Sequence, residues 1–217
     1  MTHGNSKIVT SNQQGPHDNL EVTVRRHLAH PSRKPFSQHT LDAFVEAKAW
    51  IGASQKPLIL DACCGTGEST AYIAAQHPDA LVIGVDKSLH RLNRHAGDQQ
   101  NYLLLQADLN DFWRLARQAG WQLAKHYLLY PNPYPKSVHY KRRWHASPAF
   151  ADIIALGGTL TVRSNWPLYV EEFAAALGVA GIQAQAHPYS ADQPMTAFER
   201  KYWASGQSAW QLQVDLN

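Results

Sequence analysis

The 217-residue sequence contains only two cysteines, and these are the adjacent residues Cys63 and Cys64. Adjacent cysteines cannot build a framework of structural disulfides, and two thiols do not make a zinc site, so we expect a reducing cytoplasmic location and no metal. The sequence also has no apolar stretch of membrane-spanning length, and its first thirty residues lack the apolar core of a signal peptide. These absences argue against a membrane protein and against a secreted, disulfide-stabilised one.

Two nucleotide-binding signatures are missing as well. The sequence has neither the Gly-x-Gly-x-x-Gly pattern of dinucleotide folds nor the Gly-Lys-Ser/Thr of triphosphate-binding loops. Its hydrophobic content of 44% and charged content of 17% are ordinary for a globular enzyme, and a net charge of +3 permits an anionic partner without requiring one. We expect residues 1–35 to be a polar and basic tail, partly disordered, and residues 36–217 to form a single domain.

The basic residues cluster in two places, at residues 25–34 and 136–143. The first cluster has the composition of a solvated linker, which is compatible with a second role as an arm that binds nucleic acid. The second follows three prolines at alternate positions, 131, 133 and 135, which lack backbone donors and can neither continue a central strand nor lie inside a helix. The run from Tyr130 to Arg143 therefore predicts a stiff loop that leaves the sheet and presents an amide, two aromatic rings and several cations. We call residues 130–136 the proline loop.

Short apolar runs alternate with helical patterns along the chain. We expect strands near residues 58–60, 80–85, 102–106, 127–130, 159–163, 182–186 and 209–216. We expect helices near residues 37–51, 68–76, 88–96, 112–116, 140–156, with a break near Pro148, and 166–177. This alternation predicts an α/β fold with a mostly parallel sheet and helices on both of its faces.

Three carboxylates follow the first three expected strands: Asp61, Asp86 and Asp108. Parallel sheets bind ligands at the carboxyl ends of their strands. Gly65 and Gly67 lie in the first turn, where a missing β-carbon lets a ligand approach the backbone. Asp86 can accept hydrogen bonds from two ribose hydroxyls, and Asp108 would lie beside an adenine. The pattern predicts a cofactor that contains a nucleoside.

The segment Asp61-Ala-Cys-Cys-Gly-Thr-Gly67 resembles the Asp-x-Gly-x-Gly-x-Gly loop of class I S-adenosylmethionine-dependent methyltransferases, with Cys63 in the place of the first glycine. This resemblance implies a Rossmann-like fold with a seven-stranded sheet and S-adenosyl-L-methionine as the cofactor. The implied cofactor-binding residues are Asp61, Gly65, Gly67, Asp86, Asp108 and Asn132.

Three further segments are similar, in order and spacing, to motifs of bacterial tRNA (guanine-N7)-methyltransferases. Tyr130-Pro-Asn-Pro-Tyr-Pro-Lys136 with Lys141-Arg-Arg143 resembles Phe-Pro-Asp-Pro-Trp-x-Lys followed by Lys-Arg-Arg. Ser164-Asn-Trp-Pro-Leu-Tyr169 resembles Thr-Asp-Trp-x-x-Tyr. Thr196-Ala-Phe-Glu-Arg200 resembles Thr-Lys-Phe-Glu-x-Arg. The similarity covers the chain from about Phe36 to its end.

This second resemblance implies methyl transfer from S-adenosylmethionine to guanine N7 in the variable loop of tRNA. The partner would be tRNA, with no membrane involved, and a monomer is favoured. The implied catalytic residues are Asn132, Lys136 and Asn165. The implied substrate-binding residues are Lys136, Lys141, Arg142, Arg143, Asn165, Thr196, Ala197, Phe198 and Glu199. The basic residues would hold phosphates, and residues 196–199 would fold over the cofactor or the target base.

Three departures from the family pattern change the chemistry of the motifs. The two aspartates of the motifs are Asn132 and Asn165 here, and the lysine of the last motif is Ala197. An asparagine keeps an acceptor oxygen but has no charge, which leaves alternatives open. Amino-methyltransferases carry Asn-Pro-Pro-Tyr at this strand end, so an exocyclic amine or another RNA could be the target. The chain could also be a catalytically weak, RNA-binding paralogue.

Overall fold

The computed structural model describes residues 6–97 and 100–217. The strands in these ranges are β1 (Leu58–Ala62), β2 (Leu81–Asp86), β3 (Tyr102–Gln106), β4 (Lys125–Leu129), β5 (Thr159–Ser164), β6 (His187–Tyr189) and β7 (Ala209–Asp215). The helices are α1 (Leu20–Ala29), α2 (Gln38–Ile51), α3 (Glu68–Gln76), α4 (Leu89–Leu92), α5 (Leu109–Gln118), α6 (Phe150–Ala155), α7 (Pro167–Val179) and α8 (Ala197–Ala204), with 3-10 helices η1 (Ser137–Arg142) and η2 (Trp144–Ala146).

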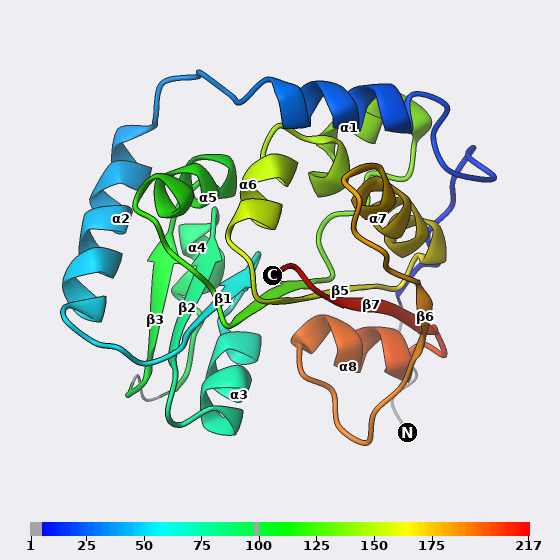
Figure 1. Ribbon diagram of the computed structural model, residues 1–217. Coiled ribbons are helices and arrows are strands. Elements are labelled where there is room, and N and C mark those ends of the chain that lie inside the picture. The colour runs from blue at the N-terminus through cyan, green and yellow to red at the C-terminus, as the bar shows by residue number, and fades with distance from the viewer. Residues whose placement is uncertain (1–5, 98–99) are drawn as a thin grey trace. The chain divides into compact units, whose positions relative to one another are not determined.

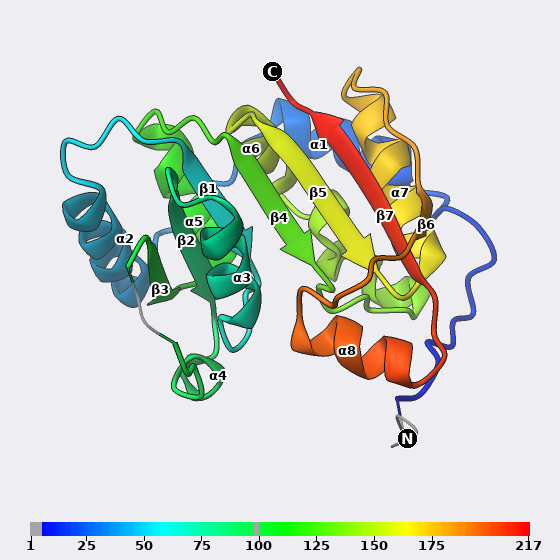
Figure 2. The same ribbon diagram turned by 90° about the horizontal axis from the view of Figure 1, so that it is seen from below.

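The seven strands form one sheet in the order β3-β2-β1-β4-β5-β7-β6 (Figures 1 and 2). β1 pairs in parallel with β2 and with β4, and β2 pairs in parallel with β3. β6 and β7 are antiparallel. The predicted fold class, an α/β fold with a mostly parallel seven-stranded sheet, is confirmed.

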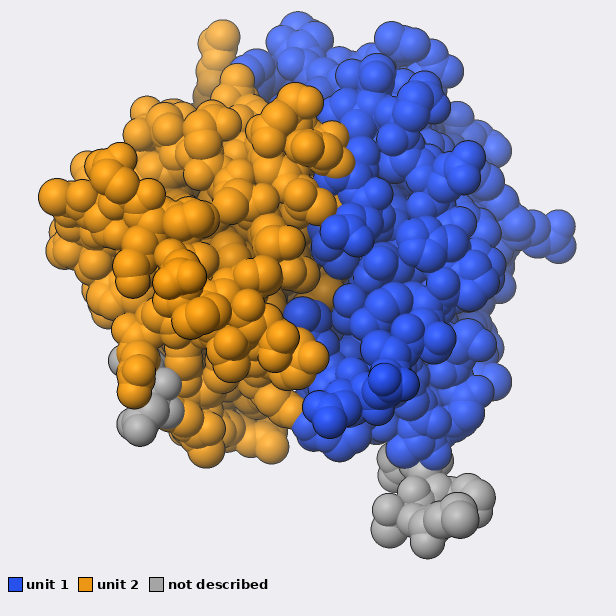
Figure 3. Space-filling model, turned by 60° about the horizontal axis from the view of Figure 1, so that its bottom comes forward, with its two compact units in different colours: residues 1–32, 130–151, 161–214 blue, residues 33–129, 152–160, 215–217 orange. Residues whose placement is uncertain are grey.

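The chain divides into two compact units, which Figure 3 colours separately. Unit 1 comprises Met1–Ser32, Tyr130–Ala151 and Thr161–Val214. Unit 2 comprises Arg33–Leu129, Asp152–Leu160 and Asp215–Asn217. Apart from Asn132, the predicted cofactor residues belong to unit 2, and all the predicted substrate residues belong to unit 1.

The core of unit 2 is built on β1 and β2, whose apolar side chains after the first residue of each strand have almost no exposed surface. α3 and α5 lie on opposite faces of these strands (Figures 1 and 2). α3 packs directly on the backbone of β2, because a β-carbon at Gly84 would lie 2.3 Å from Thr70 Oγ1. On the other face, the ring of Phe44 in α2 lies 5.5 Å from that of Phe112 in α5.

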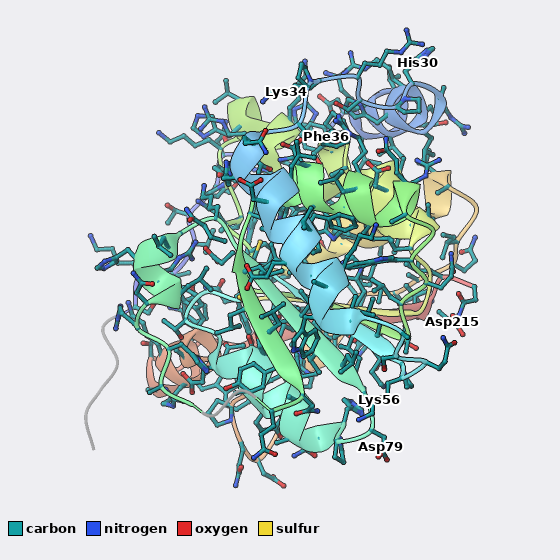
Figure 4. All side chains as sticks on the ribbon, turned by 90° about the vertical axis from the view of Figure 1, so that its left-hand side faces the viewer. His30, Lys34, Phe36, Lys56, Asp79 and Asp215 are labelled. Carbon is teal, nitrogen blue, oxygen red and sulfur yellow. The ribbon has the colours of Figure 1, made fainter. Side chains whose placement is uncertain are left out.

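The entry to α2 is fixed by Arg114 of α5. Its guanidinium lies 3.7 Å from the ring centroid of Phe36 and donates to the carbonyl of Lys34 at 2.6 Å. Figure 4 shows Phe36 where the chain enters α2. Ser37 then precedes the helix, as predicted, and Gly52 follows it with a φ of 54°.

In unit 1, α7 and α8 lie on opposite faces of β5 and β7 (Figures 1 and 2). α1 packs against α7 and buries Leu20, Thr23 and Val24. This helix lies within the expected N-terminal tail, so residues 20–29 are not an extended linker. The first five residues of that tail lie outside the described ranges.

Several element boundaries differ from those predicted. The segment 182–186 is not a strand, because the pairing partners of β7 are residues 187–189 instead. The helix expected over 88–96 is limited to α4, since the ring of His95 is held by the carbonyl of Thr66 at 2.9 Å and the hydroxyl of Tyr102 at 2.7 Å. α8 was not predicted as a helix.

None of the helices in the described ranges has both the length and the apolar composition needed to cross a membrane. The same part of the chain contains no group of three or more histidine, cysteine and acidic side chains suited to holding a metal ion.

Candidate functional site

Asp61 is the next-to-last residue of β1, and its carboxylate is completely buried. Oδ2 accepts hydrogen bonds from Ser69 Oγ at 2.6 Å and Thr70 Oγ1 at 2.7 Å, both on α3. Oδ1 is buried and finds no hydrogen-bond donor among residues 6–97 and 100–217. Burial raises the pKa of Asp61 to about 6, although the two hydroxyls oppose this rise. A buried acceptor without a donor is costly, so Oδ1 is suited to a ligand that carries a cationic N–H group.

The loop after Asp61 turns through three residues with positive φ: Cys63 at 64°, Gly65 at 63° and Gly67 at 77°. This conformation costs a non-glycine residue such as Cys63 roughly 1–2 kcal/mol. A β-carbon at Gly65 would meet no atom within 4 Å, so its backbone is open to a ligand. At Gly67 a β-carbon would lie 2.5 Å from Leu104 Cδ1, so that glycine lets the loop pack against β3.

Asp86 ends β2 and has only 1% of its surface exposed. Its Oδ2 accepts from the Gly65 N–H at 3.0 Å, and its Oδ1 accepts from the Ser88 N–H at 2.7 Å and Arg91 Nη2 at 2.8 Å. A carboxylate has about four acceptor positions, and three are used here. Asp86 therefore holds the loop that contains Gly65. It can receive two ribose hydroxyls only if the partly exposed Arg91 side chain moves away.

Asp108 precedes α5 and caps it, because Oδ1 accepts from the Asn110 N–H at 2.8 Å. Its own N–H donates to Thr40 Oγ1 at 3.0 Å. These contacts hold Asp108 at the carboxyl end of β3, the position expected from the sequence. Its contact with an adenine stays a prediction.

The proline loop in unit 1 is strained. Tyr130 and Tyr134 have φ values of 50° and 45°, which cost a non-glycine residue about 1–3 kcal/mol each. Asn132 lies between them, is exposed, and accepts the Tyr134 N–H on Oδ1 at 3.3 Å. Strain of this size persists only where surrounding contacts impose it, which is frequent at functional sites. The strained residues and the prolines of the loop both favour a single conformation.

The basic residues after the proline loop have two different environments. Lys136, Lys141 and Arg142 are exposed on or beside η1 and can reach an anionic ligand. Arg143 has no exposed surface and forms a buried ion pair with Glu172 of α7. A guanidinium without exposed surface cannot contact a phosphate, so Arg143 leaves the predicted substrate-binding set. The sequence also gave no local signal for Glu172.

The C-terminal motif starts α8. Thr196 caps the helix, since its Oγ1 accepts from the Glu199 N–H at 2.9 Å. Glu199 is completely buried and accepts from Arg163 Nη1 at 2.8 Å, the Met195 N–H at 2.6 Å and the Tyr130 hydroxyl at 3.2 Å. Glu199 therefore joins α8 to β5 and to the start of the proline loop, and it does not face a substrate. Sequence reasoning missed Arg163, although a charge in an apolar strand is a visible signal.

Three residues of the same motif are exposed, namely Ala197, Phe198 and Arg200. Phe198 has 41% of its surface exposed, and its ring stacks on that of Tyr202 with centroids 6.1 Å apart. Asn165, directly after β5, is half-buried and donates from Nδ2 to Gln207 Oε1 at 2.8 Å. That contact orients its amide and leaves Oδ1 as an acceptor.

Comparison with known proteins identifies the family. The family described as "Putative methyltransferase" matches residues 55–212. A tRNA (guanine-N(7)-)-methyltransferase of Nocardia farcinica is 30% identical, with 91% of this chain and 77% of that protein aligned. One of Magnetococcus marinus is 33% identical, with 76% and 70% aligned. A solved structure titled "Structure of an antibiotic related Methyltransferase" shares the fold, with a TM-score of 0.57 and 14% identity over 85% of this chain and 96% of that one. The chain therefore belongs to the tRNA (guanine-N7)-methyltransferase family, whose members are class I enzymes that depend on S-adenosylmethionine.

Proposed function

We propose that this protein transfers a methyl group from S-adenosylmethionine to guanine N7 in tRNA. The observation that carries the proposal is the alignment of about nine-tenths of the chain, 91%, with a relative named for this reaction. Because the substrate is tRNA, the enzyme would work in the cytoplasm.

Unit 2 supplies the residues that would hold the cofactor. S-adenosylmethionine, when bound, supplies an electrophilic methyl group attached to a positively charged sulfur. Asp61 Oδ1 is the buried acceptor without a donor, and the ammonium group of the methionine moiety is a donor of the right charge. Gly65 leaves its backbone open beside that carboxylate, and Asp86 and Asp108 would contact the ribose and the adenine.

The reaction requires little acid–base catalysis from the protein. Guanine N7 has a free lone pair on the major-groove edge of the base, so no proton has to be removed before it attacks the methyl group. The side chains have to orient the base, exclude water and stabilise the positive charge that the purine gains. A site built from amides and lysines can do this without a general base.

Asn132 and Asn165 are suited to contact the guanine. Asn132 uses one acceptor position of Oδ1 for the Tyr134 N–H and keeps a second. Asn165 keeps Oδ1 because its amide nitrogen is held by Gln207. Both would turn a neutral oxygen toward a base that becomes positively charged. Since neutral hydrogen bonds contribute less than charged ones, we expect a slower reaction than with aspartates at these positions.

Lys136, Lys141 and Arg142 would bind phosphates of the tRNA, because they are exposed beside the proline loop. Such contacts contribute affinity and orientation rather than the choice of base. Phe198 offers an exposed aromatic face, which an unstacked base could cover.

A transcript with 7-deazaguanosine in place of guanosine tests the proposal at the level of one atom. We expect labelled methyl transfer to the normal tRNA transcript and none to the 7-deaza transcript, which lacks the acceptor nitrogen. A filter-binding control with the same protein should show that both transcripts bind. Methylation of the 7-deaza transcript would instead indicate an exocyclic amine as the target. Cofactor binding without transfer to either RNA would indicate the RNA-binding paralogue.

A further inference from the structure

Arg143 carries a positive charge into the interior of unit 1. Its Nη1 pairs with the carboxylate of Glu172, and its Nε and Nη2 donate to the carbonyl of Tyr134 at 3.2 and 3.0 Å. Nη2 also donates to Gln13 Oε1 at 3.1 Å. All three nitrogens of this guanidinium are therefore used inside the unit, and two of them bind the proline loop.

The bonds to Tyr134 act on the strained part of that loop. A φ of 45° is unfavourable for tyrosine, and two guanidinium bonds to its carbonyl hold the residue in this conformation. The N–H of the same residue donates to Asn132 Oδ1 at 3.3 Å. Arg143 is thus linked to the orientation of Asn132 through a single intervening residue.

Glu172 is the partner that keeps Arg143 in place. Besides the ion pair, its carboxylate accepts from Gln13 Nε2 at 2.5 Å, the His17 N–H at 2.8 Å and His145 Nε2 at 3.1 Å. Burial alone would raise the pKa of Glu172, but the hydrogen bond from His145 and the charge of Arg143 outweigh it and bring the pKa to about 2. The carboxylate is therefore ionised at neutral pH and binds two residues of the N-terminal segment.

Residues 11–17 also contact the proline loop directly. Ser11 Oγ donates to the carbonyl of Pro135 at 2.6 Å. The side chain of Asn12 pairs with Ser137, accepting its N–H at 3.2 Å and donating to its Oγ at 3.3 Å. This segment, which composition assigns to a tail, contacts the loop through Ser11 and the buried ion pair through Gln13 and His17.

We infer that Arg143 and Glu172 are positioning residues that hold the proline loop in the conformation presenting Asn132, and that residues 11–17 complete this support. The inference rests on the proposed function, in which Asn132 contacts the guanine. In this inference residues 11–17 support the proline loop, and they need not contact RNA themselves.

Gln13→Ala is the variant that tests this inference. It removes the bonds to both Arg143 and Glu172, and because Gln13 is only half-buried and uncharged we expect the variant to fold. Gln14→Ala is the matched control, since the neighbouring glutamine is exposed. The kcat for tRNA methylation should fall at least fivefold in Gln13→Ala and not in Gln14→Ala. The KM for S-adenosylmethionine and the salt dependence of tRNA binding should stay as in the wild type.

Hydrogen exchange in the free protein gives a readout that needs no substrate. Peptides spanning residues 130–143 should exchange about tenfold faster in Gln13→Ala than in the wild type or Gln14→Ala, because the loop loses its support. If the wild type methylates no tRNA, the proposed function fails while this measurement still tests the support of the loop. Unchanged exchange would overturn the inference. A lower salt slope of tRNA binding in Gln13→Ala would also overturn it, because it would show a direct contact with RNA.

Discussion

Asp61→Asn is the substitution whose consequences the structure specifies best. Asparagine has the shape of aspartate, and its oxygen can still accept the two hydroxyls of Ser69 and Thr70. What it removes is the negative charge on a completely buried group. We therefore expect the substitution to stabilise the free protein and to weaken cofactor binding.

The effect on stability follows from the raised pKa of Asp61. The difference between its ordinary pKa of 3.8 and the value of about 6 corresponds to about 3 kcal/mol. Because the native state binds this proton more tightly than the unfolded state does, stability falls as the pH rises from about 4 to about 6, and the full cost is present above that range. At pH 7 the uncharged variant should be more stable than the wild type by up to about 3 kcal/mol, and the difference should vanish below about pH 4.

The effect on cofactor binding has the opposite sign. A hydrogen bond to a charged acceptor contributes about 1.5–3 kcal/mol, so its loss should weaken S-adenosylmethionine binding by roughly ten- to a hundredfold. Urea unfolding at pH 7 and pH 4, together with calorimetric titration of the cofactor, measures both effects. Asp79→Asn is a suitable control, because Asp79 is exposed on the same unit (Figure 4). An Asp61→Asn variant that is less stable than the wild type at pH 7, or that binds the cofactor equally well, would show that the charge of Asp61 does not have these two effects.

Three further predictions concern single residues. Asn132→Asp keeps the acceptor for the Tyr134 N–H and adds a charge, so the single-turnover rate constant of guanine N7 methylation should rise about five- to tenfold. Asn132→Ala should lower the same rate constant. Arg142→Ala removes an exposed cation, so the slope of log K for tRNA against log salt should become shallower by about 0.7–0.9, with cofactor affinity unchanged. Gly67→Ala places a β-carbon 2.5 Å from Leu104 in a backbone conformation that disfavours alanine, so thermal unfolding should occur at a lower temperature and cofactor binding should weaken.

The fold of unit 2 could be predicted from local sequence patterns. A strand buried on both faces leaves a short, continuous apolar run, and an acid directly after such a run falls at the carboxyl end of the sheet. Asp61, Asp86 and Asp108 were placed correctly for this reason. The sequence did not show that the carboxylate of Asp86 already holds Gly65 and Arg91, because these bonds depend on how the loop closes.

The roles of the charged residues of unit 1 were predicted less completely, because these roles depend on partners that are distant in the sequence. Arg142 and Arg143 are adjacent and chemically identical, yet one is exposed and the other is buried against Glu172, a residue far along the chain. No local pattern separates them. The helix α1 was missed for a related reason, since its basic composition resembles a linker and its few apolar side chains are buried by elements distant in sequence, α7 and η2.

Methyl transfer to guanine N7 can be measured by mass spectrometry of tRNA nucleosides, after incubation of tRNA with the protein and methyl-labelled S-adenosylmethionine. We expect the label in 7-methylguanosine, and we expect Asp61→Asn to reduce it strongly at a limiting concentration of cofactor. Label in a nucleoside methylated on an exocyclic amine, or no label in any tRNA nucleoside, would contradict the proposed reaction.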